Sequence, residues 1–414
     1  MNKRRYIRLG IIFLLPTVFI FSQCLNKAKP ADPRGENYAG PAACLKCHSY
    51  VAKDYLHSAH FLTSRTATAG TVSGSFKAES NTVIYNDQQK VVMEKQHGGL
   101  FQVLYTNGKL TTRKRFDIIF GANRGETYLT WDGAEVKQLP VSYYLNLHKW
   151  ANSPGGYYAD SVNFSRVIHE RCFECHASNV QNLNDESSGD AQSDSLDKTS
   201  LILGIDCERC HGPGAEHANF QAQNPTVKQA RYITRFASLS RQQRIDFCSM
   251  CHSGNSNVMT KTTFGFKPGD TLANYTSGAT FHAYRDAATI DVHGNQVKLL
   301  TSSKCYISSK IECATCHSMH NSEVKTVATY STYCTNCHSA ANHNVCKLAA
   351  QIGPAITTNC IDCHMPVKSS KTIVVKGTNM QGTPPFLART HLIAIYPEET
   401  QKVIVMLLAT KSKR

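Results

Sequence analysis

The sequence contains no apolar run long enough to cross a lipid bilayer. The run Leu9–Phe21 has 13 residues, whereas a membrane-spanning helix needs about 20. Four basic residues stand directly before it: Lys3, Arg4, Arg5 and Arg8. A short apolar run behind a basic start is typical of a targeting signal. Residues 1–23 are therefore expected to be a signal peptide that exports the chain to the periplasmic side.

The signal segment also lacks a clear A-x-A cleavage site. It ends Phe21-Ser22-Gln23-Cys24, and a lone cysteine at this place resembles the lipidation site of a bacterial lipoprotein. Phe21 and Gln23 differ from the leucine and the small residue that are usual there. We expect Cys24 to carry a lipid that anchors the protein to a membrane, with residues 24–37 as a flexible tether. The alternative is an ordinary cleaved signal with an incidental cysteine.

A calcium-binding loop is missing as well. The Ser/Asp-rich segment Gln181–Lys198 is poor in apolar residues, but it does not contain the D-x-[DN]-x-[DN]-G spacing that calcium loops use. Its composition predicts a solvated surface loop instead.

Cysteine and histidine, in contrast, are abundant, with 17 and 18 residues. They combine into the pattern C-x-x-C-H, for which random placement at these frequencies would give only about 0.03 copies. The chain has seven copies, numbered here motif 1 to motif 7: Cys44–His48, Cys172–His176, Cys207–His211, Cys248–His252, Cys313–His317, Cys334–His338 and Cys360–His364.

C-x-x-C-H is the attachment signature of a c-type haem. Two thiols at positions i and i+3 lie on one face of a helical turn and form thioethers with the haem vinyl groups, and the next histidine binds the iron. Structural zinc, the alternative for paired cysteines, does not require a histidine after each pair. We therefore predict seven covalently bound c-type haems. The expected thioether cysteines are Cys44, Cys47, Cys172, Cys175, Cys207, Cys210, Cys248, Cys251, Cys313, Cys316, Cys334, Cys337, Cys360 and Cys363, and the expected proximal iron ligands are His48, His176, His211, His252, His317, His338 and His364.

The formal net charge of +15 could suggest a nucleic-acid partner. Removal of the signal leaves about +11, and the propionates of seven ferric haems would reduce this to about +4. The basic residues are better explained as propionate partners, so no nucleic acid is expected.

The motifs divide the chain unevenly. Residues 38–69 form a first haem unit, 70–150 contain no motif, 151–395 hold the other six motifs, and 396–414 are expected to be a C-terminal helix. Six motifs within about 220 residues leave too little chain for an independent hydrophobic core. The expected fold is mainly α and irregular, with short helices around stacked haems that themselves form the core. The final helix is expected to pack against this core rather than bind a membrane, because its apolar run is short.

The segment without motifs has the pattern of a small antiparallel β subdomain. Asn107-Gly108 separates the strand-like runs Leu100–Thr106 and Lys109–Phe120, and Asp132-Gly133 separates Thr127–Trp131 from Ala134–Leu139. Both dipeptides favour tight hairpin turns. A scaffold or docking role is expected, since nothing in the segment resembles a chemical site.

Eleven histidines lie outside the motifs, and seven of them are needed if every iron has two histidine ligands. His320 follows His317 by three residues and is free to bind a neighbouring iron. His60, or else His57, and His217 are further candidates from their positions beside motifs 1 and 3. Isolated histidines such as His97 and His148 are expected to be surface residues.

With these residues in view, the chain resembles the bacterial doubled-CxxCH multihaem cytochromes, in the superfamily of the tetrahaem electron carrier of ammonia oxidisers and hydroxylamine oxidoreductase. The segments that carry the resemblance are Cys44–His48 with Ser58–His60, Leu139–Tyr144, Asn152–Gly155, Cys207–Gly214, Cys313–His320, Cys360–Pro366 and Arg389–His391. The resemblance implies mostly bis-histidine irons, with His60, His217, His320 and His391, and also His293 and His343, as distal ligands. The seventh would be His282, His169 or His57. Nitrite reductases of this superfamily replace one motif with C-x-x-C-K, which is absent here.

Two cysteines are left over, Cys305 and Cys346. In an oxidising compartment a leftover pair is expected to form a disulfide, which would fasten the connection after motif 4 to the segment after motif 6.

The leading hypothesis for function is electron transfer through a chain of closed haems, with quinol-linked proteins or other cytochromes as redox partners. The competing hypothesis is an oxidoreductase in which no seventh histidine is available as a distal ligand, so that one iron has an open position and acts on a small nitrogen or sulfur compound. Catalytic residues for such a reaction are unknown. A purely structural role for the seven haems is the alternative that we favour least.

Overall fold

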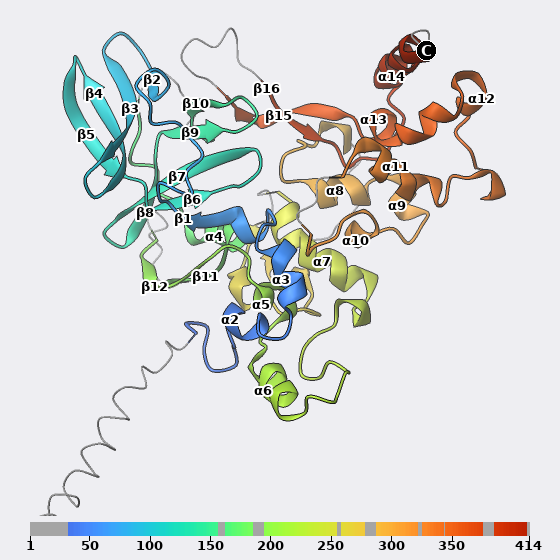
Figure 1. The fold of residues 1–414 in the computed structure, drawn as a ribbon, viewed down its shortest axis with the longest axis horizontal. Coiled ribbons are helices and arrows are strands. Elements are labelled where there is room, and N and C mark those ends of the chain that lie inside the picture. Colours follow the sequence, from blue (N-terminus) through green and yellow to red (C-terminus); the bar gives the residue numbers. More distant parts are fainter. Residues whose placement is uncertain are drawn as a thin grey trace, which may run out of the picture.

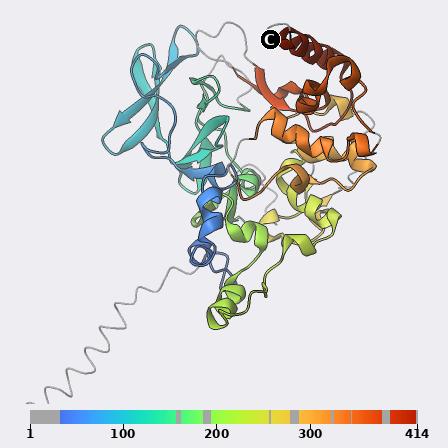
Figure 2. The same cartoon turned by 45° about the vertical axis from the view of Figure 1, so that its right-hand side comes forward.

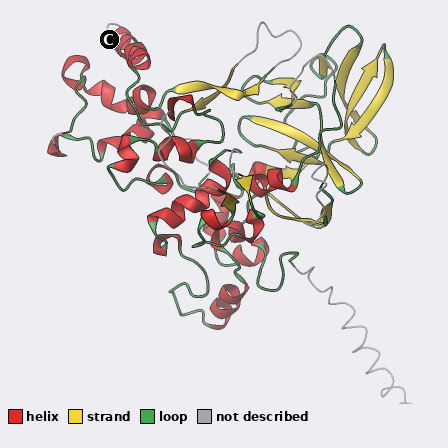
Figure 3. Ribbon diagram, turned by 180° about the vertical axis from the view of Figure 1, so that it is seen from behind, coloured by secondary structure: helices red, strands yellow, loops and turns green. Residues whose placement is uncertain are grey.

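The computed structural model describes residues 32–411, apart from 156–161, 185–193, 255–257, 278–286, 322–324, 343 and 376–384. The expected signal peptide, Cys24, His282 and His343 lie outside the described residues. Strands gather on one side of the molecule and short helices on the other (Figures 1 and 3). None of the helices within the described ranges is long and apolar enough to cross a membrane.

The chain begins with short helices around motif 1. Pro41 at the start of the first one has a fixed backbone angle and no N–H to satisfy, which suits the first turn of a helix. The elements are α2 (Pro41–Cys44), α3 (Ser49–Tyr55) and the 3₁₀ turn η1 (Phe61–Thr63).

The following 90 or so residues form two antiparallel sheets. The first has the strand order β2-β3-β4-β5, and the second has the order β1-β6-β7-β9-β10 with β8 paired to β7. The strands are β1 (Ser64–Thr66), β2 (Thr82–Ile84), β3 (Gln89–Gln96), β4 (Gly99–Thr106), β5 (Lys109–Arg115), β6 (Ile118–Phe120), β7 (Gly125–Asp132), β8 (Glu135–Gln138), β9 (Val141–Tyr144) and β10 (Lys149–Asn152).

Both expected hairpins are present. Thr106 pairs with Lys109 across the first turn, where Asn107 and Gly108 have φ of 51° and 76°. Asp132 pairs with Glu135 across the second, where Gly133 has φ of 66°. Positive φ at these positions matches the right-handed twist of the strands and is best tolerated by Asn and Gly.

The β region has its own hydrophobic core. The side chains of Phe116, Ile119, Tyr128 and Leu139 are at most 1% exposed, and they pack with Trp150 between the two sheets. Aromatic pairs reinforce the packing, with the rings of Phe116 and Tyr128 centred 4.6 Å apart. This part of the chain can therefore bury a large apolar area without help from a cofactor.

Strands also occur where none were expected. The segment Gln181–Lys198 is not only a surface loop, because β11 (Ala177–Asn182) pairs with β12 (Leu196–Leu203) and brings its two ends together. Buried Val180 and Leu196 explain the pairing, since they pack against the β region. Two further ribbons join β13 (Val258–Met259) to β14 (Thr276–Ser277) and β15 (Val367–Val374) to β16 (Pro385–Arg389). The fold is thus more strongly mixed than the expected α and irregular class.

The remaining chain consists of short helices joined by turns. The α-helices are α4 (Glu170–His176), α5 (Cys207–His211), α6 (Ala215–Gln223), α7 (Arg241–His252), α8 (Gln296–Thr301), α9 (Lys304–Ile307), α10 (Cys313–Cys316), α11 (Val327–Thr335), α12 (Ala349–Ile352), α13 (Cys360–His364) and α14 (Pro397–Lys411). The 3₁₀ turns are η2 (Phe236–Ser238), η3 (Thr263–Gly265), η4 (Leu272–Asn274), η5 (Ala287–Thr289), η6 (Ala340–Asn342) and η7 (Pro354–Thr358).

The helical part is thinly packed by comparison. Its largest apolar cluster in the described residues consists of Met250, Phe266, Leu272 and Tyr275. The C-terminal helix α14 is present as expected and lies against α12, α13 and η7. Between these helices the chain surrounds a cavity rather than a packed core.

Candidate haem-binding site

The helical part encloses one continuous cavity of about 4080 Å³. Pockets for a single small ligand are about 300–1,000 Å³, so this cavity has room for several large groups. Both cysteines and the histidine of every one of the seven motifs line it. Segments that are far apart in the sequence thus place cysteine and histidine side chains in one cavity.

Local backbone geometry orients each motif. The histidine N–H donates to the carbonyl of the first cysteine at 3.0 Å in motifs 1 and 5 and at 2.8 Å in motif 6. In motif 3 the whole of Cys207–His211 is helical, and the Asp206 side chain accepts a hydrogen bond from Arg209 N at its N-terminus. A helical turn places residues i and i+3 on one face, so the two thiols of a motif point the same way.

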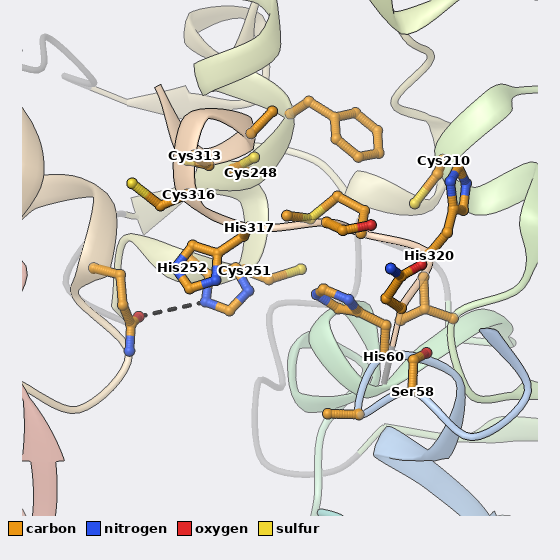
Figure 4. A pocket seen from close by; sticks show the side chains of 18 of the residues that line it. Ser58, His60, Cys210, Cys248, Cys251, His252, Cys313, Cys316, His317 and His320 are labelled. Atoms are coloured by element: carbon orange, nitrogen blue, oxygen red, sulfur yellow. Dashed lines mark hydrogen bonds between the residues drawn. The ribbon is translucent and has the colours of Figure 1, made fainter. Parts of the chain in front are cut away.

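Four motif histidines each face a histidine from outside the motifs. The ring centroids of His48 and His217 are 6.4 Å apart, those of His211 and His320 5.9 Å, those of His252 and His60 6.1 Å, and those of His317 and His391 6.2 Å. Figure 4 shows His60, His252, His317 and His320 in the cavity, with Cys251, Cys313 and Cys316 beside them. Each pair joins two segments remote in sequence.

The spacing of these pairs fits a metal ion between them. Two imidazole nitrogens bound to opposite sides of one ion at about 2 Å each would place the ring centroids on the order of 6 Å apart. The described pairs have this separation, and none of the hydrogen bonds of the described residues joins the two rings of a pair. The residues present therefore fit a haem iron held by two histidines.

Burial keeps many of these imidazoles neutral. Desolvation lowers the pKa of His60, His176 and His391 to about 4, and burial also lowers the pKa of His211, His252, His293 and His317. A histidine binds metal in its neutral form. The cavity thus supplies these side chains in the protonation state that an iron ligand needs.

Hydrogen bonds fix several of the rings through Nδ1. His217 Nδ1 lies 2.8 Å from Arg231 O, His364 Nδ1 lies 2.8 Å from Ala394 O, and His252 Nδ1 lies 3.3 Å from Gln296 Oε1 (dashed in Figure 4). A proton held at Nδ1 leaves the lone pair of Nε2 free to bind metal. These acceptors orient the ligands and fix their tautomer.

Thiols of different motifs lie next to each other. Four pairs of thiols are close enough to shift each other's pKa: Cys44 with Cys207, Cys175 with Cys251, Cys248 with Cys313, and Cys334 with Cys360. The neighbouring thiol lowers the pKa of Cys175 to about 7 and that of Cys360 to about 6 and raises the pKa of Cys251 and Cys334, as expected for a coupled pair. The motifs are therefore close neighbours in space.

Other candidate ligands are placed less completely. His293 lines the cavity, and its charge would act on His176 of motif 2, although no ring contact joins them in the described structure. His338 and His364, of motifs 6 and 7, face no second histidine ring among the described residues. His57, His97, His148 and His169 do not line the cavity in the part of the chain that is described.

The expected disulfide is not formed in this structure, where Cys305 and Cys346 are both free thiols. Burial raises the pKa of Cys305 most, and the charge of Cys337 raises it further. The charge of Cys346, in contrast, raises the pKa of Cys363. Each leftover thiol thus lies beside a different motif.

A buried ionic cluster fastens motif 1 to motif 3. Arg34 donates to Asp206 at 2.7 Å and to Glu208 at 3.2 Å. The Glu208 side chain is 1% exposed, and it also accepts from the backbone N–H groups of Ala39 and Gly40 at 2.8 Å. Because Glu208 lies between the two cysteines of motif 3, the cluster sets the relative position of the two motifs.

Sequence patterns did not reveal which residues hold the ligands in place. Asp291 is one such residue: its carboxylate accepts hydrogen bonds from His293 N at 2.7 Å and from Thr372 N at 3.2 Å. Burial raises the pKa of Asp291, but these backbone hydrogen bonds outweigh burial and lower it overall. A lone aspartate two residues before a candidate ligand gives no signal without the fold.

Comparisons with known proteins agree with this geometry. Residues 151–212, which contain motifs 2 and 3, match the family described as cytochrome c554 and c-prime. The structure resembles the crystal structure of outer cell wall cytochrome OcwA with a TM-score of 0.51 and 16% sequence identity, over 89% of this chain and 82% of that one. At this identity the likeness concerns the fold. No curated protein matches the chain.

The segment 151–212 thus matches a cytochrome family, and the fold as a whole resembles that of a cytochrome.

Proposed function

We propose that the chain is an exported seven-haem c-type cytochrome that carries electrons through mostly bis-histidine haems. Covalently bound haem supplies the redox-active iron. The motif histidines would bind from one side, and His217, His60, His320 and His391 would close motifs 1, 4, 3 and 5 from the other. Ligands of this kind keep an iron closed to substrate, and the hydrogen bonds at Nδ1 and the burial of each ring tune its potential.

The facing histidine pairs are the observation that carries this proposal. Ordinary surface histidines would not be paired one to one with motif histidines in four places at 5.9–6.4 Å. Nor would all eight of these histidines line one cavity together with every motif.

The contacts between thiols support one order of the motifs in space. Motif 1 adjoins motif 3 and motif 6 adjoins motif 7 through contacts of α2 with α5 and of α11 with α13, and the thiols of motifs 4 and 5 are electrostatic neighbours. Electrostatic contacts between Cys210 and Cys248 and between Cys316 and Cys334 link these pairs. We infer the row 1-3-4-5-6-7, with motif 2 beside motif 4 through Cys175 and Cys251. Electrons would travel along this row.

Haem content and coordination test the proposal directly. A pyridine haemochrome assay on the purified protein is expected to give seven haems per chain, and six or fewer would contradict it. Low-temperature EPR of the oxidised protein is expected to show low-spin iron that nitrite, hydroxylamine and cyanide do not change. The measurement also covers motifs 6 and 7, whose irons would need His282 and His343.

The arrangement around motifs 6 and 7 favours a second candidate, a multihaem oxidoreductase. Neither His338 nor His364 faces another histidine among the described residues, so one of these irons could hold an open site for a small nitrogen or sulfur compound. A high-spin EPR signal that disappears when one of the added ligands binds would support this function over simple electron transfer.

Location and partners are part of the same proposal. The signal segment and Cys24 support a lipoprotein on the periplasmic side, and the OcwA protein is by name an outer cell wall cytochrome. Redox partners would be quinol-linked proteins or other cytochromes. Labelling of the expressed protein with a radioactive fatty acid tests the anchor: the wild type should be labelled, and a Cys24→Ala variant should not.

A further inference from the structure

One end of the inferred row is open to solvent. Cys47 and His48 of motif 1 are exposed, as are Cys337 and His338 of motif 6 near the other end, whereas the cysteines of motifs 2 to 5 are all at least partly buried. The helix α2 of motif 1 packs against α5 of motif 3. In Figures 1 and 2 the elements around it, α2, α5 and α6, lie together at one end of the molecule.

The surface at this end carries more basic than acidic side chains. We call it the motif 1 surface, and it is formed by two segments, one carrying His48 and the other following His217. Its exposed cations are Lys46, Lys53, Lys228, Arg231 and Arg235, of which Lys46, Lys228 and Arg235 also line the cavity, and the exposed acids nearest to them in sequence are Asp54 and Glu216. Between Glu216 and Asp246 the sequence has no acidic residue, and none of the five cations forms an ion pair within the described residues.

The second segment is held directly against the candidate ligand of motif 1. Arg231 O accepts the hydrogen bond of His217 Nδ1 at 2.8 Å, and the His217 ring faces His48. A charge on this segment therefore lies beside the redox group that motif 1 would bind.

Two exposed tyrosines stand among the cations. Tyr50 is 76% exposed and Tyr232 is 51% exposed. Tyr232 has φ of 58°, an uncommon and strained value for a bulky residue. The fold thus holds a large aromatic side chain at the surface at an energetic cost. Aromatic and arginine side chains are enriched where proteins bind one another.

We propose that the motif 1 surface is the docking site for a redox partner protein that presents an acidic face around its own electron-transfer group. The proposal rests on the proposed function, since it needs a haem at motif 1. In the step itself the reduced partner gives up one electron, and the ferric iron held by motif 1 becomes ferrous; no bond forms or breaks. Complementary charge would speed the encounter of the two proteins, and salt would weaken this acceleration.

Two flavins that differ in one phosphate can probe this surface. Reduced FMN carries the phosphate and reduced riboflavin does not, while their redox-active rings are the same. We expect stopped-flow reduction of the oxidised protein at low ionic strength to be about tenfold faster with FMN. Near 1 M salt, where the Debye length is about 3 Å, the two rates should converge.

The test variant is K53E/R231E, because both residues are exposed and neither lines the cavity. Within this variant, the ratio of the FMN rate to the riboflavin rate should fall to about one or below. K95E/K109E, on exposed positions of the β region, is the matched control and should keep the FMN advantage. K53Q/R231Q provides a milder change if the reversal impairs folding.

An FMN advantage that survives K53E/R231E, or that K95E/K109E removes equally, would overturn the docking site. Either result in a protein with seven reducible haems would leave the proposed function intact. A chain without reducible haems would overturn both.

Discussion

At the scale of single residues, the notable feature is how few side chains connect different motifs. His317 and His320 are three residues apart, yet they face partners in different places, His391 and His211. One turn of chain would therefore hold the irons of motifs 5 and 3 at a fixed separation.

Replacement of His320 tests this double use. His320→Ala should convert one low-spin haem to a high-spin form, because the ring facing His211 is removed. His320→Met should instead restore a sixth ligand and raise the potential of that haem by on the order of 0.1 V.

EPR and a redox titration of the purified variants measure both effects. His97→Ala is the control, since His97 is exposed in the β region and does not line the cavity. A His320→Ala spectrum that matches the wild type would show that His320 is not a ligand.

Glu208 is the second critical residue. Its buried carboxylate accepts hydrogen bonds from Ala39 N, Gly40 N, Gly214 N and Arg34. Glu208→Ala leaves Arg34 and three N–H groups without this partner, and removal of one member of a buried ion pair costs about 3–5 kcal/mol.

Hydrogen exchange should reveal the loss locally. The amides of Ala39 and Gly40 should exchange about 100-fold faster or more in Glu208→Ala, because 1.4 kcal/mol corresponds to a factor of ten. Glu216→Ala, at an exposed position on α6, should leave them protected. Unchanged protection in Glu208→Ala would mean that the cluster does not fasten the N-terminal segment.

The motif residues could be predicted from sequence because their chemistry is local. A C-x-x-C-H pattern needs one helical turn and nothing else. The pairing of His60 with His252, or of His217 with His48, depends on contacts across more than 150 residues of sequence, so position in the chain alone could give candidates but not partners.

At the scale of elements, hydrogen bonds of the segment 291–295 hold His293 in place. Asp291 ties it to β15 through Ser370 Oγ and the backbone of Lys371 and Thr372. Gly254 N donates to Gly294 O at 2.7 Å and ties it to the end of α7. A candidate ligand of motif 2 is thus positioned by two elements at once.

Asp291→Ala should loosen the attachment of the segment 291–295. The loss of several hydrogen bonds, each worth on the order of 1 kcal/mol, should increase hydrogen exchange over residues 291–295. If His293 binds the iron at motif 2, a high-spin fraction should appear in the EPR spectrum. Asp291→Asn keeps one acceptor oxygen and should restore part of the low-spin signal.

Asp87→Ala, at an exposed site between β2 and β3, is the matched control. Faster exchange of residues 291–295 without any change in spin state would show that Asp291 holds the loop but that His293 is not a ligand.

Element prediction succeeded where turn chemistry was decisive. Asn107-Gly108 and Asp132-Gly133 fixed two hairpins by their positive φ. The β11–β12 ribbon was missed because its polar sequence resembles a loop, and only the burial of Val180 and Leu196 against the β region makes it a strand pair.

At the scale of the whole molecule, apolar packing is distributed unequally between the β region and the helical part. The β region buries Phe116, Tyr128 and Trp150 in its own core, whereas the helical part surrounds a cavity of about 4080 Å³. An unfilled apolar space of this size would not persist, because protein interiors pack densely.

A chain produced without haem should therefore fold only in part. Limited proteolysis of haem-free protein, expressed without residues 1–23, should leave a resistant fragment that contains β2 to β10, identified by mass spectrometry. The haem-loaded protein should resist cleavage along its whole described length. Equal resistance of the helical part without haem would show that it folds independently of the cofactor.

Because motif histidines contact histidines that are remote in sequence, the order of synthesis would also set the order in which the iron sites are completed. Domains and segments near the N-terminus leave the ribosome first. The partner of motif 4, His60, precedes it in the chain, but the partners of motifs 1, 3 and 5 follow them: His217, His320 and His391. During biogenesis, motif 4 could be completed as soon as it is made. The other three would wait for later sequence, with motif 1 waiting longest, since 169 residues separate His48 from His217. Until His391 emerges, close to the end of the chain, motif 5 would stay open.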